Sequence, residues 1–123
     1  MNKYNSLIAR ILLAHIFVLA GMNKIMGYAG TQGYMEAMGV PSILLPLVIG
    51  LELAGGLALV IGWQTRYIAY ALAGFSIVSA IIFHNNLAEQ AQMIMFMKNL
   101  AIAGGLMLLA EHGAGALSLE NKK

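Results

Sequence analysis

Glu52 is the residue best placed to do chemistry, because it is the one ionisable side chain in a long apolar run, residues 43–63. A helix of ~20 residues rises ~1.5 Å per residue and so crosses a hydrocarbon core of ~30 Å. Glu52 therefore lies near the middle of a predicted membrane span. An ionised, unpaired carboxylate at that depth costs roughly 2.5–3.5 kcal/mol. We expect Glu52 to face the protein interior, where it either carries a proton or pairs with a cation.

A second set of polar side chains is predicted near the outer ends of the spans. Its members are Asn23, Lys24, His84, Lys98 and Asn99. As hydrogen-bond donors they could bind the carbonyl oxygens of a quinone head group or a small oxyanion, while Glu52 takes up or releases the proton that accompanies electron transfer. Simpler roles are open for each: lysines snorkel to the interface, asparagines join helices, and a histidine at a helix end is often interfacial.

Three further residues are assigned to structural or ion-pair roles, namely Arg10, His15 and Arg66. At ~100° per residue, Arg10 shares one face of the first span with Lys24. It could pair with Glu52 or snorkel to the inner head groups. His15 lies well round from that face, and we interpret it as a neutral histidine facing the bundle. If the ion-pair role holds, the partner of Glu52 is Lys24, Lys98, His15 or Arg10.

The composition is that of a membrane protein, with 60% hydrophobic and 10% charged residues among 123. Four apolar segments, about 7–26, 43–63, 67–84 and 93–110, are long enough to span a bilayer. They predict an all-α membrane protein, a four-transmembrane-helix bundle formed by one domain over residues 1–123. A short interfacial helix is expected after the first span, capped by Thr31. The N-terminal segment resembles a signal peptide, but Arg10 and His15 interrupt its apolar core, so we expect it to be retained.

Charge and residue types limit the remaining possibilities. Basic residues are concentrated on the side of the two termini, which predicts that both termini are cytoplasmic; these residues are Lys3, Arg66, Lys122 and Lys123. No basic run suggests nucleic-acid binding. The chain lacks Cys, and its three histidines do not share metal-ligand spacing on one helix. We therefore expect no metal site and no intrinsic cofactor.

Several motifs, in this order, resemble those of the DoxX family. They are Arg10-x-Leu-Leu, Ala20-Gly-Met-Asn-Lys24, Tyr34-Met-x-x-Met-Gly-Val-Pro41, Leu51-Glu-Leu-Ala-Gly-Gly56, Gly62-x-x-Thr-Arg66, Phe83-His84 and Phe96-Met-Lys-Asn99 with Gly104-Gly105. The resemblance covers nearly the whole chain and implies a small, stand-alone, multi-pass protein of the bacterial inner membrane. By this resemblance, the recurrent polar positions of the family correspond to Arg10, Lys24, Glu52, Arg66, His84 and Asn99.

The resemblance also implies two kinds of function. Some relatives are the small subunit of a thiosulfate:quinone oxidoreductase, and others are partners in thiol-redox or oxidative-stress assemblies. One hypothesis is therefore a subunit or accessory of a membrane redox system, with bound quinone and redox partner subunits. The other is a non-catalytic scaffold in the lipid bilayer, held by an internal ion-pair network. A homo-oligomer is compatible with either hypothesis.

Overall fold

The computed structural model describes residues 3–83, 88–115 and 117–119, and within these ranges the chain forms helices and no strands. The elements in chain order are α1 (Lys3–Met26), α2 (Tyr28–Ala37), the 3₁₀ turn η1 (Ser42–Leu44), α3 (Leu45–Ile61), α4 (Thr65–Phe83) and α5 (Gln90–His112). Four segments are long and apolar enough to cross a membrane: Tyr4–Met26, Ser42–Ile61, Thr65–Phe83 and Gln90–His112. The predicted four-helix membrane bundle is confirmed. The placement of both termini in the cytoplasm stays a prediction.

The helices extend beyond some of the predicted spans because apolar length measures only the part inside the hydrocarbon. Helix α5 begins at Gln90, after Glu89 in an extended conformation, and so includes polar residues ahead of the apolar segment. Helix α4 is described as far as Phe83, and the predicted site residue His84 lies outside the described residues.

The short helix after the first span is present, but its predicted cap is wrong. Helix α2 begins at Tyr28, so Thr31 lies one turn inside it. The Thr31 hydroxyl donates a hydrogen bond to the Gly27 carbonyl, one turn earlier in the chain, at 2.9 Å. A Thr within a helix often forms this bond to the residue four positions earlier. The helix ends before Gly39, whose φ of +79° suits a glycine.

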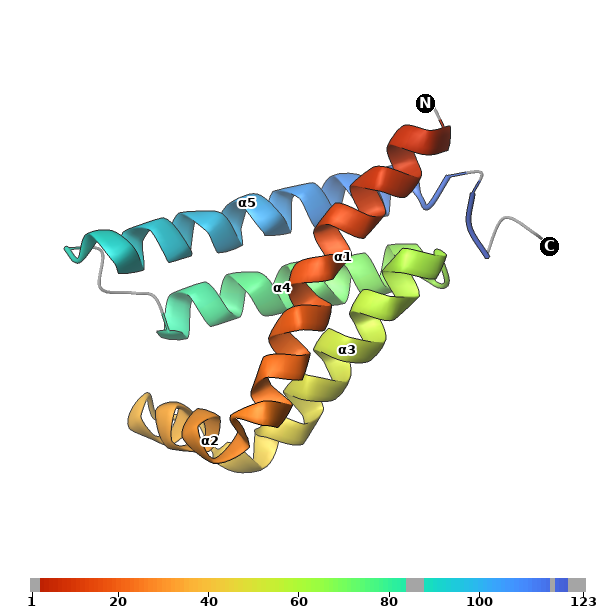
Figure 1. Cartoon of the computed structure of the whole chain (residues 1–123). Coiled ribbons are helices and arrows are strands. Elements are labelled where there is room, and N and C mark those ends of the chain that lie inside the picture. The colour runs from red at the N-terminus through yellow and green to blue at the C-terminus, as the bar shows by residue number, and fades with distance from the viewer. Residues whose placement is uncertain (1–2, 84–87, 116, 120–123) are drawn as a thin grey trace.

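The bundle consists of two helix pairs that diverge from one end (Figure 1). Helix α1 packs along α3, and α4 packs along α5. The pairs are joined by the tight turn between α3 and α4, and α1 contacts α5 where Leu13 meets Gly105. The buried core lies at this junction, between residues of α1, α3, α4 and α5. Away from the junction the two pairs separate, and this divergence positions the candidate site.

Close contact between α1 and α3 depends on glycine at position 56. A Cβ atom there would lie 2.7 Å from Val18 Cγ2 and 3.2 Å from the backbone oxygen of Ala14. Gly56→Ala is therefore expected to destabilise the protein by about 1–3 kcal/mol, because two helix backbones must move apart. Gly104→Ala is the matched control, since outside its own turn of α5 no atom lies within 4 Å of the added methyl group. Unfolding in detergent, followed by circular dichroism, tests both variants; equal stability would contradict the packing role.

Candidate functional site

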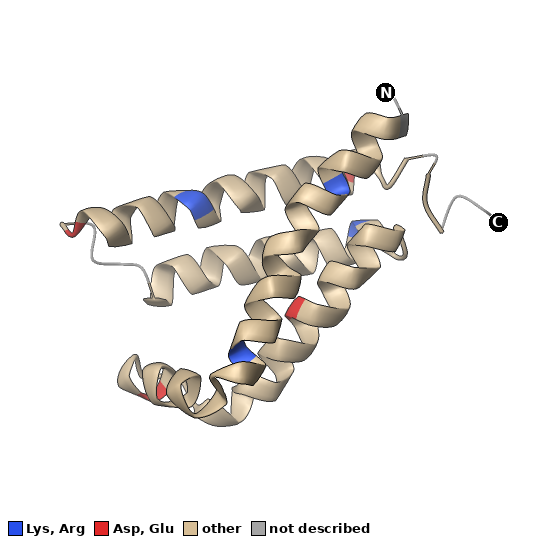
Figure 2. Ribbon diagram, in the orientation of Figure 1, with Lys and Arg blue, Asp and Glu red and all other residues tan. Residues whose placement is uncertain are grey.

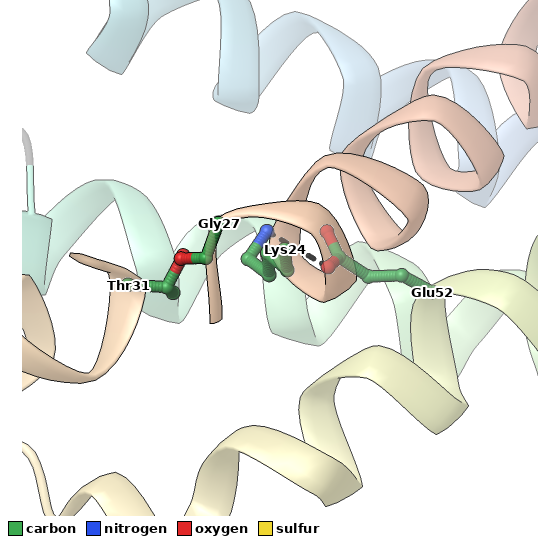
Figure 3. A network of polar contacts seen from close by, with 4 residues as sticks. All are labelled: Lys24, Gly27, Thr31 and Glu52. Atoms are coloured by element: carbon green, nitrogen blue, oxygen red, sulfur yellow. Dashed lines mark hydrogen bonds and ion pairs between the residues drawn. The ribbon is translucent and has the colours of Figure 1, made fainter. Parts of the chain in front are cut away.

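Glu52 forms an ion pair with Lys24, the last basic residue of α1. Lys24 Nζ lies 2.8 Å from Glu52 Oε1, and the side chains are 27% and 4% exposed respectively. Figure 3 shows the two side chains reaching toward each other from α1 and α3. The structure thus answers the question raised by the sequence: a cation lies against the buried carboxylate.

The pair forms because α1 and α3 approach closely one turn before Lys24. A Cβ atom on Gly21 would lie 3.4 Å from the Cβ of Glu52 and 2.7 Å from Leu53 Cγ. Gly21 and Lys24 are three residues apart and so share a face of α1. The lysine stem spans the remaining distance to the carboxylate. Charged positions are otherwise few along the described helices (Figure 2).

A cavity of about 520 Å³ lies beside the ion pair, between the two diverging helix pairs. Most of its wall is apolar, and Phe17, Val48 and Phe75 line it from three different helices. Lys24 and Glu52 are among its lining residues. The volume is within the range of small-molecule sites, which are mostly apolar with a few polar groups.

Neutral polar groups line other parts of the cavity. Asn99 on α5 donates from Nδ2 to the backbone carbonyl of Ser76 on α4 at 3.3 Å, and both residues line the cavity together with Ser79. An asparagine amide has two N–H donors, and the bond to Ser76 uses one of them. The cavity therefore offers both charged and neutral donors.

An aromatic contact lies at the cavity wall between α2 and α4. The rings of Tyr34 and Phe83 stack with centroids 5.3 Å apart and planes inclined by 26°. The Tyr34 hydroxyl also donates to the Phe83 carbonyl at 3.4 Å. These contacts hold α2 against the end of α4, and both residues line the cavity.

The structure brings together only part of the predicted outer set. Lys24 and Asn99 line one cavity with Glu52, whereas Asn23 and Lys98 are exposed and are not among the lining residues. Successive helical residues point ~100° apart, so Asn99 faces the cavity while Lys98 does not. His84 lies outside the described residues.

Arg10 is fully buried and binds backbone carbonyls at the end of α3. Its Nη1 donates to Leu59 at 2.9 Å and to Val60 at 2.8 Å, and its Nη2 donates to Leu117. The last turn of a helix leaves carbonyls without helical partners, and a cation there is favourable. The structural role assigned to Arg10 thus takes the form of a cap on a helix end.

Arg66 and His15 have different surroundings. Arg66 Nε donates to the Ala110 carbonyl at 3.4 Å, which links the start of α4 to the end of α5. His15 is exposed, with its Nδ1 against the carbonyl of Leu12. The prediction that His15 faces the bundle is wrong, because it lies roughly 140° round α1 from the face formed by Arg10 and Lys24.

Four polar lining residues were not predicted as part of the site, namely Thr31, Tyr34, Ser76 and Ser79. Two of them carried a usable signal: Ser76 and Ser79 are hydroxyl residues three positions apart in an apolar span, and that spacing puts them on one face. Across the described ranges, no three His, Asp or Glu side chains are grouped as a metal site would need.

Fold and site together define a polytopic α-helical membrane protein in which Lys24 pairs with the buried Glu52 beside a cavity between the helices. The DoxX family model matches residues 6–85, and the chain belongs to the DoxX family. It is 56% identical over 120 residues to inner membrane protein YqjF of Escherichia coli strain K12, covering 95% of this chain and 92% of that one. It is 37% identical over 123 residues to inner membrane protein YphA of the same organism, covering 94% and 88%.

A third relative is named "Putative oxidoreductase CatD", from Bacillus subtilis strain 168; it is 31% identical over 85 residues, or 67% of this chain and 63% of that one. No solved structure matches the chain. The two relatives named as inner membrane proteins and the four spanning helices place this protein in the bacterial inner membrane as a multi-pass protein.

Proposed function

We propose that this protein is a subunit or accessory of a membrane redox system and binds a quinone head group in the cavity between its helix pairs. One observation carries the proposal: a largely apolar cavity of about 520 Å³ has the Lys24–Glu52 ion pair and Asn99 in its wall. A quinone ring is flat and apolar, and its two carbonyl oxygens accept hydrogen bonds. The cavity offers matching surfaces for both features.

The polar residues would perform two tasks during quinone reduction. Asn99 and the Lys24 ammonium would donate hydrogen bonds to carbonyl oxygens, which strengthen as negative charge develops on those oxygens. A quinone gains two electrons and two protons to become a quinol. The electrons would come from a redox partner subunit. The Lys24 ammonium, held by Glu52, would pass one proton to the nearer reduced oxygen, and water would supply the second proton at the other oxygen.

Similarity to the relative named as a putative oxidoreductase also supports a redox role, independently of the cavity. The similarity covers 67% of this chain. The proposal for this protein therefore depends mainly on the cavity and its donors.

A second candidate function is a non-catalytic scaffold. The Lys24–Glu52 ion pair and the bonds from Arg10 to the α3 carbonyls favour it, because both fasten helices to one another. In that case the cavity would hold lipid chains, and loss of the ion pair would change stability alone.

Quinone bound to the purified protein separates the two candidates. Extraction of the full chain from membranes in mild detergent should yield co-purified quinone, measured by chromatography. Asn99→Leu should weaken quinone binding about tenfold, since one hydrogen bond of about 1–1.5 kcal/mol is lost. Glu52→Gln should also weaken it, because the Lys24 ammonium is then less firmly positioned.

The control is Lys98→Gln, an exposed residue next to Asn99 that does not line the cavity. It should keep the quinone content of the unmodified protein. Absence of quinone from folded protein, or equal binding by the Asn99 and Lys98 variants, would favour the scaffold.

A further inference from the structure

The charges of the described residues in the cavity wall balance one another. Among these residues Lys24 contributes the one positive charge, and the Glu52 carboxylate lies 2.8 Å from it. The remaining polar lining residues are neutral, namely Thr31, Tyr34, Ser76, Ser79 and Asn99. From the described part of the wall, a ligand in the cavity therefore meets hydrogen-bond donors but no net positive charge.

The other described lysine and arginine side chains outside the N-terminal turn add no positive charge to the cavity wall. Lys98 is exposed and outside the cavity lining, and Arg10 is bound to carbonyls at the end of α3. Arg66 reaches the end of α5. None of the three is among the residues that line the cavity.

An anion would gain little in such a site. It would lose its hydration on entering a mostly apolar cavity, and that loss is offset only by an unmatched positive charge or many donors. Lys24 is already neutralised by Glu52, whose own charge would repel the incoming anion. A neutral carbonyl group loses much less hydration and needs only one or two donors.

We infer that the cavity selects neutral ligands with carbonyl acceptors and rejects oxyanions and other anions, and that Glu52 is the residue that sets this selectivity. The inference extends the proposed function, since it takes the quinone site as its setting and excludes the oxyanion alternative. It also has a consequence of its own: without the Glu52 charge, Lys24 becomes an unmatched cation in an apolar cavity, which is an anion site.

A matched pair of ligands tests the selectivity directly. The full chain in a non-ionic detergent is titrated with 1,4-naphthoquinone and with 1,4-naphthoquinone-2-sulfonate, which share a ring system and differ by one negative charge. The unmodified protein should bind the neutral quinone about tenfold or more tightly than the sulfonate. Glu52→Gln should reduce or invert that preference, and Lys98→Gln should leave it unchanged. Comparing ratios between variants removes the effect of partitioning into micelles.

Titration with thiosulfate tests the selectivity against anions without depending on quinone binding. By isothermal titration calorimetry, thiosulfate should bind Glu52→Gln and give no detectable binding to the unmodified protein. The inference would be overturned if thiosulfate or the sulfonate bound the unmodified protein as tightly as it binds Glu52→Gln. If that variant does not fold, tight binding of either anion to the unmodified protein would overturn the inference by itself. If thiosulfate binds only the variant and naphthoquinone binds neither, charge selection stands and the quinone function fails.

Discussion

Lys24→Met is expected to destabilise the protein by about 3–5 kcal/mol, the usual cost of removing one partner from a buried ion pair. The variant leaves the Glu52 carboxylate, only 4% exposed, without its cation in the interior of a membrane protein. Glu52→Leu should cost less, because the Lys24 side chain is 27% exposed and its ammonium therefore keeps part of its hydration where it lies. Unfolding in mixed micelles, with the folded fraction followed by circular dichroism, measures both variants.

Two further measurements test whether the stability lost in Lys24→Met is caused by the unpaired charge of Glu52. The double variant Lys24→Met/Glu52→Leu should recover most of the stability, because neither charge is then buried alone. The loss in Lys24→Met should also shrink as the medium is acidified, since a proton on Glu52 removes the unpaired charge. A double variant as unstable as Lys24→Met, with no dependence on pH, would show that shape rather than charge is responsible.

The four spans could be predicted from the sequence because one quantity, the thickness of the hydrocarbon core, sets their length. The interior position of Glu52 follows from the same physics, since a carboxylate facing lipid is costly. Its partner could not be predicted, because the sequence predicts similar depths for Lys24 and Lys98. The choice depends on which helices pair, and α3 packs along α1 through Gly21 and Gly56.

Other features of the site depend on contacts that side-chain types do not reveal. The partners of Arg10 are backbone carbonyls, and every residue has one, so no sequence pattern marks Leu59 or Val60 as acceptors. The cavity arises from the divergence of two helix pairs and has no local signature in the chain. His15 could have been placed correctly, because its angle from the face of Arg10 already indicated the exposed side.

Arg10→Met is the second change expected to have a large effect, with a loss of about 3–5 kcal/mol. The guanidinium donates to three carbonyls from the end of α3 and the C-terminal segment, and bonds from a charged donor contribute about 1.5–3 kcal/mol each, less when several share one group. The Val60 carbonyl would then lose the Arg10 donor, and the Leu59 carbonyl would keep only the 3.2 Å bond from the Gly62 N–H. Arg10→Lys should recover only part of the loss, because an ammonium cannot match the planar fork.

Local proteolysis of the C-terminal segment tests whether Arg10 holds that segment against α3. Residues 117–119 are held against α3 by Arg10 and by the bond from Leu119 N–H to the Ile61 carbonyl at 2.7 Å. Arg10→Met should therefore make the segment around Leu117 sensitive to chymotrypsin under conditions in which the unmodified protein is resistant. Arg66→Met is the matched control: it loses a single 3.4 Å bond at a more exposed position, so a change below ~1 kcal/mol and no new cleavage are expected. Equal effects of the two substitutions would mean that the bonds from Arg10 do not hold the C-terminal segment against α3.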